Sequence, residues 1–406
     1  MSLNNTPSSE RVHIGIFGRR NAGKSSIINA ITGQDLAIVS DVMGTTTDPV
    51  LKSMELLPLG PVVIIDTPGL DDEGALGTLR VHKAYQMLNK TDIALLVVDG
   101  TSGMTREDDA ILAKIRKKNI PYVIVYNKAD LSNKPREISD DNAIWVSTST
   151  GENIEELKEL IGRQVPDSSG SRHIAADLVE PLDMVVLVVP IDKAAPKGRL
   201  ILPQQQTIRD LLEAGVASIV VRDTELAGVL AKLGTPPALV ITDSQAFAQV
   251  AADTPDNIPL TSFSILFARY RGGLDIMSNG VYSLDTLEDG DNVLISEGCT
   301  HHRQCDDIGT VKLPRLIRKH TGKELNFVFT SGTEFPDDLT NYALVIHCGG
   351  CMLNPREVTH RLRCARDQQV PITNYGIAIA HMQGILERSL EPLRNTVFPF
   401  NSTSAW

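Results

Sequence analysis

The octapeptide from Gly18 to Ser25 constrains the fold of this chain more than any other stretch of its sequence. It reads Gly-Arg-Arg-Asn-Ala-Gly-Lys-Ser, which matches the pattern G-x-x-x-x-G-K-S of phosphate-binding loops. The apolar segment 12–17 before it is typical of a strand, and the segment 26–30 after it is typical of a helix. A phosphate-binding loop in this strand, loop and helix setting predicts an N-terminal P-loop domain of the α/β class.

The residue types in this loop each serve the binding of a nucleoside triphosphate. Backbone N–H groups surround the phosphates, the Lys24 side chain reaches the β- and γ-phosphates, and the Ser25 hydroxyl binds Mg²⁺. We therefore predict that the nucleotide-binding residues of the loop are Gly18, Asn21, Ala22, Gly23, Lys24, Ser25 and Ser26.

Two further segments carry candidate groups for the metal and the γ-phosphate. The apolar run 62–65 is typical of a strand and ends at Asp66, a carboxylate that can hold the Mg²⁺ shell. Gly69 follows and offers a backbone N–H to the γ-phosphate. In the segment 44–48, Thr46 is the candidate that supplies a hydroxyl to Mg²⁺ and senses the γ-phosphate.

The sequence Asn-Lys-Ala-Asp at 127–130 follows an apolar, strand-like run and predicts that the base is guanine. The Asp130 carboxylate can accept hydrogen bonds from two adjacent donors of guanine, which adenine does not present. Asn127 braces the loop, and the stem of Lys128 covers the ring. The next strand-like run ends in a polar loop whose residues back the base, namely Ser147 and Thr148.

This third of the chain resembles the translation-factor-related GTPases of the MnmE, Era and EngA type. Where such proteins have Asn at the position of Asn21, the resemblance implies that this side chain helps to hold a K⁺ ion in the role of an arginine finger. Leu70 stands where Ras-like proteins carry a water-orienting Gln, so slow intrinsic turnover is expected. The candidate catalytic residues are Lys24, Asn21, Thr46 and Gly69.

All 5 cysteines of the 406-residue chain lie in its last third. Cys348 and Cys351 form a Cys-x-x-Cys that His347 directly precedes, and a second group, with Cys299 and His301, lies upstream. Each group follows a strand-like run, so both are expected at the carboxyl ends of strands, where open α/β sheets hold their ligands. Two such groups predict a metal or metal cluster clamped between two chain segments.

The spacing alone supports a structural zinc site and an iron–sulfur cluster equally, because Cys and His suit both. A disulfide is disfavoured, since the number of cysteines is odd and no secretory segment is present. Buried thiols without a metal are the weakest of these interpretations.

Composition excludes several classes of protein. The formal net charge of -11 and the aromatic content of 4% disfavour a nucleic-acid-binding protein, which usually has a basic surplus. No apolar run approaches the length of a membrane span, and the polar N-terminus lacks the apolar region of a signal peptide. We therefore expect a cytoplasmic protein that binds neither nucleic acid nor membrane.

The alternation of apolar and amphipathic segments predicts three domains. Residues 1–166 form the GTP-binding domain, and a Pro- and Ser-rich linker follows. Residues 172–260 form a small α/β domain without a catalytic constellation, which favours an interaction or dimerisation role. Residues 261–406 form the cysteine-bearing domain. No internal repeat is apparent in the sequence.

The whole chain resembles the HydF family, the GTPase maturases of FeFe-hydrogenase. The resemblance covers essentially the full chain, and three motifs carry it: the phosphate-binding loop, Cys299-Thr-His301 and His347-Cys348-Gly-Gly-Cys351. It implies a 4Fe–4S cluster held by Cys299, Cys348 and Cys351, with one exchangeable iron that His301 or His347 can approach. The expected fold is thus a P-loop GTPase domain followed by two smaller α/β domains, the last with an iron–sulfur site.

The resemblance also implies a function and partners. The protein would be a scaffold and carrier that receives a transient di-iron precursor made with two radical-SAM maturases and passes it to apo FeFe-hydrogenase. The middle domain would make a homodimer. The alternative is a zinc-containing regulatory GTPase of ribosome or RNA maturation, which the acidic balance disfavours.

Overall fold

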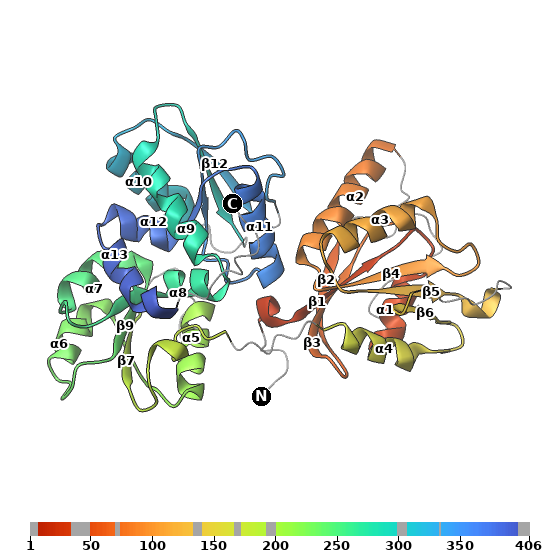
Figure 1. Ribbon diagram of the computed structural model, residues 1–406, viewed down its shortest axis with the longest axis horizontal. Coiled ribbons are helices and arrows are strands. Elements are labelled where there is room, and N and C mark those ends of the chain that lie inside the picture. The colour runs from red at the N-terminus through yellow and green to blue at the C-terminus, as the bar shows by residue number, and fades with distance from the viewer. Residues whose placement is uncertain are drawn as a thin grey trace. The chain divides into compact units, whose positions relative to one another are not determined.

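The chain divides into two compact units, Met1–Gly170 and Ser171–Trp406 (Figure 1). No helix in the described part of the chain is long and apolar enough to cross a membrane. The structure, a computed structural model, describes residues 7–33, 49–69, 74–132, 140–165, 172–191, 200–298, 307–332 and 334–396.

A six-stranded sheet forms the centre of the N-terminal unit, with the strand order β2-β3-β1-β4-β5-β6. Strand β2 pairs antiparallel with β3, and all other pairs are parallel. The interior strands are almost wholly apolar because helices cover both faces of the sheet. The strands are β1 (Val12–Phe17), β2 (Val50–Leu56), β3 (Gly60–Asp66), β4 (Ile93–Asp99), β5 (Tyr122–Asn127) and β6 (Ala143–Trp145).

Two hydrophobic clusters fill the two sides of this sheet. One contains Ile27 from α1 and Leu157 from α4, and the other contains Met87 from α2 and Ile111 from α3. Two helices therefore cover each face, as the α/β class requires. The helices are α1 (Lys24–Thr32), α2 (Gly74–Met87), α3 (Arg106–Lys117) and α4 (Ile154–Arg163).

Two four-stranded sheets, both entirely parallel, form the C-terminal unit. The first has the order β10-β9-β7-β8 and consists of β7 (Met184–Val188), β8 (Ala217–Val221), β9 (Leu239–Thr242) and β10 (Leu260–Ser262). The second has the order β12-β11-β13-β14 and consists of β11 (Asn292–Glu297), β12 (Asn326–Ser331), β13 (Leu344–His347) and β14 (Ile372–Asn374).

One hydrophobic core extends through both of these sheets. The predicted domain boundary at residue 260 therefore falls inside one compact unit, and it stays a prediction. The helices around the two sheets are α5 (Leu202–Glu213), α6 (Leu226–Leu230), α7 (Phe247–Asp253), α8 (Phe263–Tyr270), α9 (Leu274–Gly280), α10 (Leu313–Thr321), α11 (Pro355–Asp367), α12 (Tyr375–Met382) and α13 (Leu386–Leu390).

The two sheets repeat one topology, which the sequence analysis did not find. In each, the first strand along the chain lies between the second and the third, and the fourth lies beyond the third. The fourth strands β10 and β14 both lead directly into a helix, and the last strand residue caps that helix. Ser262 accepts a hydrogen bond from the Ile265 N–H, and Asn374 accepts one from the Ile377 N–H. The two sheets therefore share their strand order and this helix cap, although the capping residue is Ser in one and Asn in the other.

The two repeats meet at equivalent positions of helices α8 and α12. Ser264 is the second residue of α8, and Gly376 is the second residue of α12. A Cβ atom on Gly376 would lie 2.2 Å from the Ser264 Cβ and 2.6 Å from the Ser244 Oγ. The Asn374 side-chain amide donates to the Ser264 carbonyl oxygen at 3.2 Å. Contact between equivalent positions is the relation that a twofold axis produces.

We predict that Gly376→Ala destabilises the C-terminal unit by about 1–3 kcal/mol, because the added methyl group overpacks this contact. Gly228→Ala is the matched control, since Gly228 also lies in a helix of this unit and a Cβ there meets nothing within 4 Å. The control is expected to be neutral or stabilising by up to about 1 kcal/mol. Urea denaturation followed by circular dichroism measures both, and equal midpoints for the two variants would contradict close packing of α8 on α12.

Candidate functional site

Lys24 folds back over the phosphate-binding loop between β1 and α1. Its Nζ donates to the carbonyl oxygens of Gly18 at 2.9 Å and Arg19 at 2.8 Å, and the side chain is buried. Gly18 and Gly23 have φ values of +144° and +96°, which side chains with a Cβ rarely adopt. The loop thus holds an ammonium group where phosphate oxygens can replace its carbonyl partners.

Asn127 connects this loop to the loop after β6. Its Nδ2 donates to the Ala22 carbonyl oxygen at 3.2 Å, and its Oδ1 accepts from the N–H and the hydroxyl of Thr148, both at 3.4 Å. A Cβ on Gly23 would lie 2.1 Å from Asn127 Nδ2, so only glycine allows this approach. The buried Asn127 side-chain amide therefore links the loop expected to bind the phosphates to the loop expected to contact the base.

The base end carries a carboxylate that is already oriented. The Ser147 hydroxyl donates to Asp130 Oδ1 at 2.6 Å, which fixes the carboxylate plane. Lys128 Nζ lies 2.6 Å from Asp99 Oδ2 at the end of β4. Burial raises the pKa of Asp99, but hydrogen bonds from Lys128 and Thr101 outweigh it and hold this pKa below its usual range. Lys128 is thus anchored by its ammonium group and offers its stem to a ring.

Asp66 ends β3 beside the loop and fits a Mg²⁺ site. Its Oδ1 is buried and has no hydrogen-bond partner among the described residues. Burial raises the pKa of Asp66, an effect that the Lys24 and Lys52 ammonium groups oppose. A buried carboxylate oxygen without a partner is costly, and a hydrated divalent cation satisfies it.

The structure describes some of the other predicted residues of this site but not all of them. Ser25 and Ser26 lie in the first turn of α1, and Gly69 lies three residues beyond β3. Asn21 is exposed in the loop with φ +58°. Thr46 and Leu70 lie outside the described residues.

In the C-terminal unit, Cys348 follows β13, beside the end of β11. Its Sγ accepts hydrogen bonds from the N–H groups of Gly298 at 3.0 Å and Gly350 at 3.4 Å. Gly350 has φ +64°, the left-handed conformation that turns the chain toward Cys351. Gly298, whose N–H contacts the Cys348 sulfur, is the last described residue before Cys299 in the sequence. Cys299, His301 and Cys305 themselves lie outside the described residues.

Burial raises the pKa of Cys348, and it raises the pKa of Cys351 to about 11. The Arg361 guanidinium near Cys348 and the Arg271 guanidinium near Cys351 oppose this effect. Both thiols are protonated at neutral pH, and a metal that binds them must displace the protons. Two N–H donors and nearby guanidinium groups stabilise the thiolates that remain.

His347 has both ring nitrogens engaged. Its Nδ1 lies 2.6 Å from the Cys348 carbonyl oxygen, and its Nε2 lies 3.0 Å from Arg361 Nη1. Burial and the Arg361 charge lower the pKa of His347 to about 3, so it is neutral and accepts from Arg361 at Nε2. In this arrangement His347 orients the Cys348 backbone, and binding a metal through Nε2 requires Arg361 to move.

Arg361 is the residue of this site that the sequence analysis missed. It is 1% exposed on α11, and it donates to Glu357 Oε1 at 3.0 Å, Ser296 Oγ at 3.2 Å and the Gly332 carbonyl oxygen at 2.7 Å. A buried guanidinium is stable only with such a complete set of partners. No local pattern marks Arg361, because its partners are contributed by four separate segments of the chain.

Cys364 is on the same helix and contacts the His360 ring, with its Sγ 3.5 Å from Nε2. It packs against the hydrophobic core. This environment is that of an ordinary half-buried thiol.

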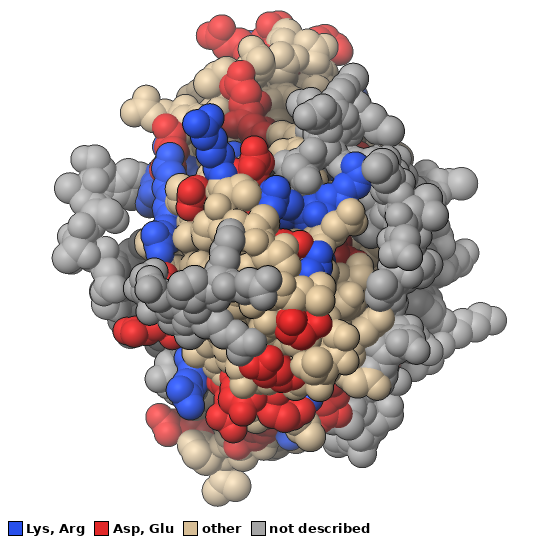
Figure 2. Space-filling view, turned by 90° about the vertical axis from the view of Figure 1, so that its right-hand side faces the viewer, with Lys and Arg blue, Asp and Glu red and all other residues tan. Residues whose placement is uncertain are grey.

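Charged side chains are unevenly distributed on the side where Figure 1 draws the N-terminal unit. Figure 2 shows most of the Lys and Arg side chains of this face in its upper middle, with Asp and Glu side chains gathered both at the top and in the lower part.

Three family models match this chain. Residues 174–272 match the hydrogen maturase F dimerization domain, and residues 275–392 match the hydrogen maturase F tetramerization domain. Together these two cover more than half of the chain. Residues 13–128 match the 50S ribosome-binding GTPase family.

The chain belongs to the hydrogen maturase F family. Its N-terminal unit is a P-loop GTPase domain, followed by further α/β layers, and the expected fold class is confirmed to that extent.

Curated relatives match over the GTPase region. The tRNA modification GTPase MnmE of Nitrosomonas eutropha is 36% identical over 160 residues, which are 38% of this chain and 35% of that protein. The MnmE of Legionella pneumophila (strain Corby) is 38% identical over 160 residues, with the same coverage of 38% and 35%. This chain therefore spans about a third of the length of these relatives.

A solved structure, Era of Aquifex aeolicus bound to GDP and AlF₄⁻, is 22% identical. The match covers 52% of this chain and 92% of that one, with a TM-score of 0.35.

We predict that Asp130→Asn weakens GTP binding by roughly 10–100-fold, since a lost hydrogen bond to a charged group costs about 1.5–3 kcal/mol. The same variant should gain affinity for xanthosine triphosphate, whose exocyclic oxygen needs a donor. Asp109→Asn on the exposed face of α3 is the control and should change neither affinity. Fluorescent-nucleotide titration measures both, and an unchanged preference for GTP in Asp130→Asn would contradict the assignment of the base site.

Proposed function

We propose that this protein is a maturation GTPase of FeFe-hydrogenase that carries a precursor of the active-site cluster. The observation that supports this most is the position of Cys348. Its sulfur accepts the Gly298 N–H at the ends of two adjacent strands, inside a segment that matches a hydrogen maturase F domain. Gly298 and Cys348 come from different segments to one edge of a sheet, and Cys299 is the next residue in the sequence after Gly298.

The donor set fits an iron–sulfur cluster with three protein ligands. Cys299, Cys348 and Cys351 would hold a 4Fe–4S cluster, whose fourth iron stays open to exchange. His301 is a candidate for the open iron. His347 is a weaker one, because Arg361 occupies its Nε2. When bound, the cluster supplies an iron site to which a di-iron precursor can attach.

Groups around the cysteines would stabilise thiolates bound to a cluster relative to neutral thiols. The Gly298 and Gly350 N–H groups donate to the Cys348 sulfur, and two guanidinium groups offset the negative charge of a thiolate-bound cluster. Zinc fits the same thiols, so a zinc-containing regulatory GTPase of ribosome or RNA maturation is the alternative. Visible absorbance after anaerobic reconstitution separates the two, since a zinc site is colourless.

In the N-terminal unit we propose hydrolysis of GTP to GDP and phosphate. Lys24 would bind the β- and γ-phosphates, Ser25 and Asp66 would hold the Mg²⁺ shell, and Thr46 and Gly69 would sense the γ-phosphate. Mg²⁺ would neutralise charge on the phosphates when bound. Asn21 would ligate a K⁺ ion that replaces an arginine finger.

The two activities would be coupled through partner binding. Among the described residues, the nucleotide-binding residues lie in one compact unit, and Cys348 and Cys351 lie in the other. We propose that GTP governs association with, or release from, a radical-SAM maturase and leaves the ligation of the cluster unchanged. The match to dimerization and tetramerization domains supports a homo-oligomer.

The cysteine assignment predicts a sharp difference between two half-buried thiols. Cys351→Ser should lose most of its iron and its EPR signal after reconstitution, because one of three protein ligands is gone. Cys364→Ser, on α11, should retain both. Iron and sulfide analysis with EPR of the reduced protein decides it. Equal loss in the two variants would refute the ligand set, and zinc without iron in the wild type would favour the alternative function.

A role for Asn21 predicts that hydrolysis depends on the monovalent cation. Turnover should be faster in K⁺ than in Na⁺ at equal ionic strength, and Asn21→Ala should lose most of this difference. Asn119→Ala is the matched control, because Asn119 is also an exposed residue with positive φ, +49° against +58°. Phosphate release under multiple turnover measures both. Equal rates in the two salts for the wild type would contradict the K⁺ assignment.

A further inference from the structure

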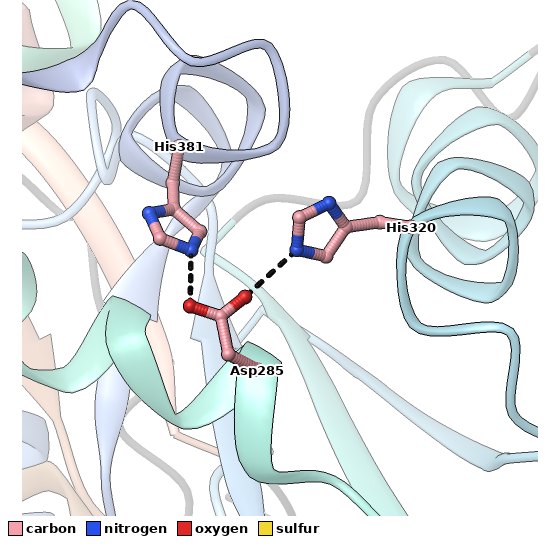
Figure 3. A group of neighbouring side chains, drawn as sticks. All are labelled: Asp285, His320 and His381. Atoms are coloured by element: carbon pink, nitrogen blue, oxygen red, sulfur yellow. Dashed lines mark hydrogen bonds and ion pairs between the residues drawn. The ribbon is translucent and has the colours of Figure 1, made fainter.

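Three side chains from three different elements converge in the C-terminal unit, apart from the cysteines. Asp285 lies in the 3₁₀ segment η8 (Val281–Thr286), His320 lies in the last turn of α10, and His381 lies in the last turn of α12. Figure 3 shows both imidazoles directed at the one carboxylate. His320 Nε2 lies 2.9 Å from Asp285 Oδ1, and His381 Nε2 lies 2.9 Å from Asp285 Oδ2.

We propose that Asp285, His320 and His381 bind a first-row divalent cation of the Zn²⁺ class. The three ligand atoms all lie within 4.8 Å of one another. Zinc–nitrogen and zinc–oxygen bonds of about 2.0–2.1 Å place tetrahedral ligand atoms about 3.3 Å apart. A small opening of the two 2.9 Å contacts therefore admits the ion. Two imidazoles and one carboxylate favour Zn²⁺, Fe²⁺ or Co²⁺ over the all-oxygen ligands of Mg²⁺ and Ca²⁺.

The surroundings hold these ligands in place. The His320 and His381 side chains are 27% and 14% exposed, whereas the Asp285 side chain is 48% exposed. The Tyr282 ring lies edge-on to the His381 ring, with centroids 5.3 Å apart, and its hydroxyl donates to Glu387 at 3.1 Å. Both histidines lie at helix carboxyl ends, where the helix dipole favours a cation. The open side of Asp285 leaves a fourth position for water or an exogenous ligand.

The repeated topology supplies an internal comparison. Asp177 precedes β7 by the same number of residues by which Asp285 precedes β11, and Arg269 is the seventh residue of α8 as His381 is of α12. In the first repeat the carboxylate is paired with the Arg269 guanidinium. Guanidinium neutralises an acid but offers no lone pair to a metal. In the second repeat, His381 stands at the position of this arginine, and His320 from α10 adds a second imidazole to the carboxylate.

Cobalt(II) titration of the full chain, under anaerobic conditions and without nucleotide, tests the proposal. Binding to this site gives visible d–d absorption without the near-ultraviolet thiolate-to-cobalt charge transfer that the cysteines would produce. His320→Ala and His381→Arg should each weaken this binding by about 100-fold or more. His381→Arg restores the pairing of the first repeat, so it removes the ligand while an ion pair still holds the three elements.

His173→Ala is the control variant, because His173 pairs with Asp210 at 3.2 Å, and among the described residues this pair belongs to no group of three metal-binding side chains. It should leave the cobalt spectrum and affinity unchanged. Displacement of cobalt by Zn²⁺ would confirm the class of ion. A wild type that shows only the thiolate spectrum, or none, would overturn the proposal. So would a His381→Arg variant that binds cobalt as well as the wild type does.

Discussion

In both units the central strands are held by parallel hydrogen-bonded ladders, and this pairing sends the carboxyl ends of neighbouring strands to the same edge of the sheet. In the N-terminal unit, Gly18, Asp66, Asp99 and Asn127 end or follow four adjacent strands. In the C-terminal unit, Gly298 and Cys348 follow two adjacent strands. Parallel ladders need buried, apolar strands, so reactive side chains are confined to the loops at this edge.

Sequence patterns predicted the parts of the site in which a few consecutive residues determine both the backbone conformation and the groups that bind the ligand. The phosphate-binding loop and Asn127–Asp130 were found because each needs glycines, a lysine or a carboxylate at fixed spacing. The bracing role expected of Asn127 has a structural basis in its bonds to Ala22 and Thr148. The strands expected at 12–17 and 62–65 were found because buried parallel strands are continuous apolar runs.

What the sequence did not reveal depends on contacts between distant segments. Arg361 is a polar residue on an amphipathic helix, and only the tertiary structure buries it against Ser296, His347 and Gly332. The cluster of Asp285, His320 and His381 draws on segments too far apart to form a motif. The repeat escaped notice because helix capping by Ser in one copy and Asn in the other satisfies the same geometry.

The repeated topology of the C-terminal unit is the arrangement that duplication of an ancestral segment produces. Thr242 ends β9 where His347 ends β13, and the turn after β9 continues with Asp243 and Ser244 in place of the cysteine loop. Since the two copies support each other through one core, each half could diverge without having to fold alone. New functional residues could then evolve in one copy while the other copy preserved the fold. In a heterodimer, a paralogous subunit can preserve the fold in this way, but here both copies belong to a single polypeptide.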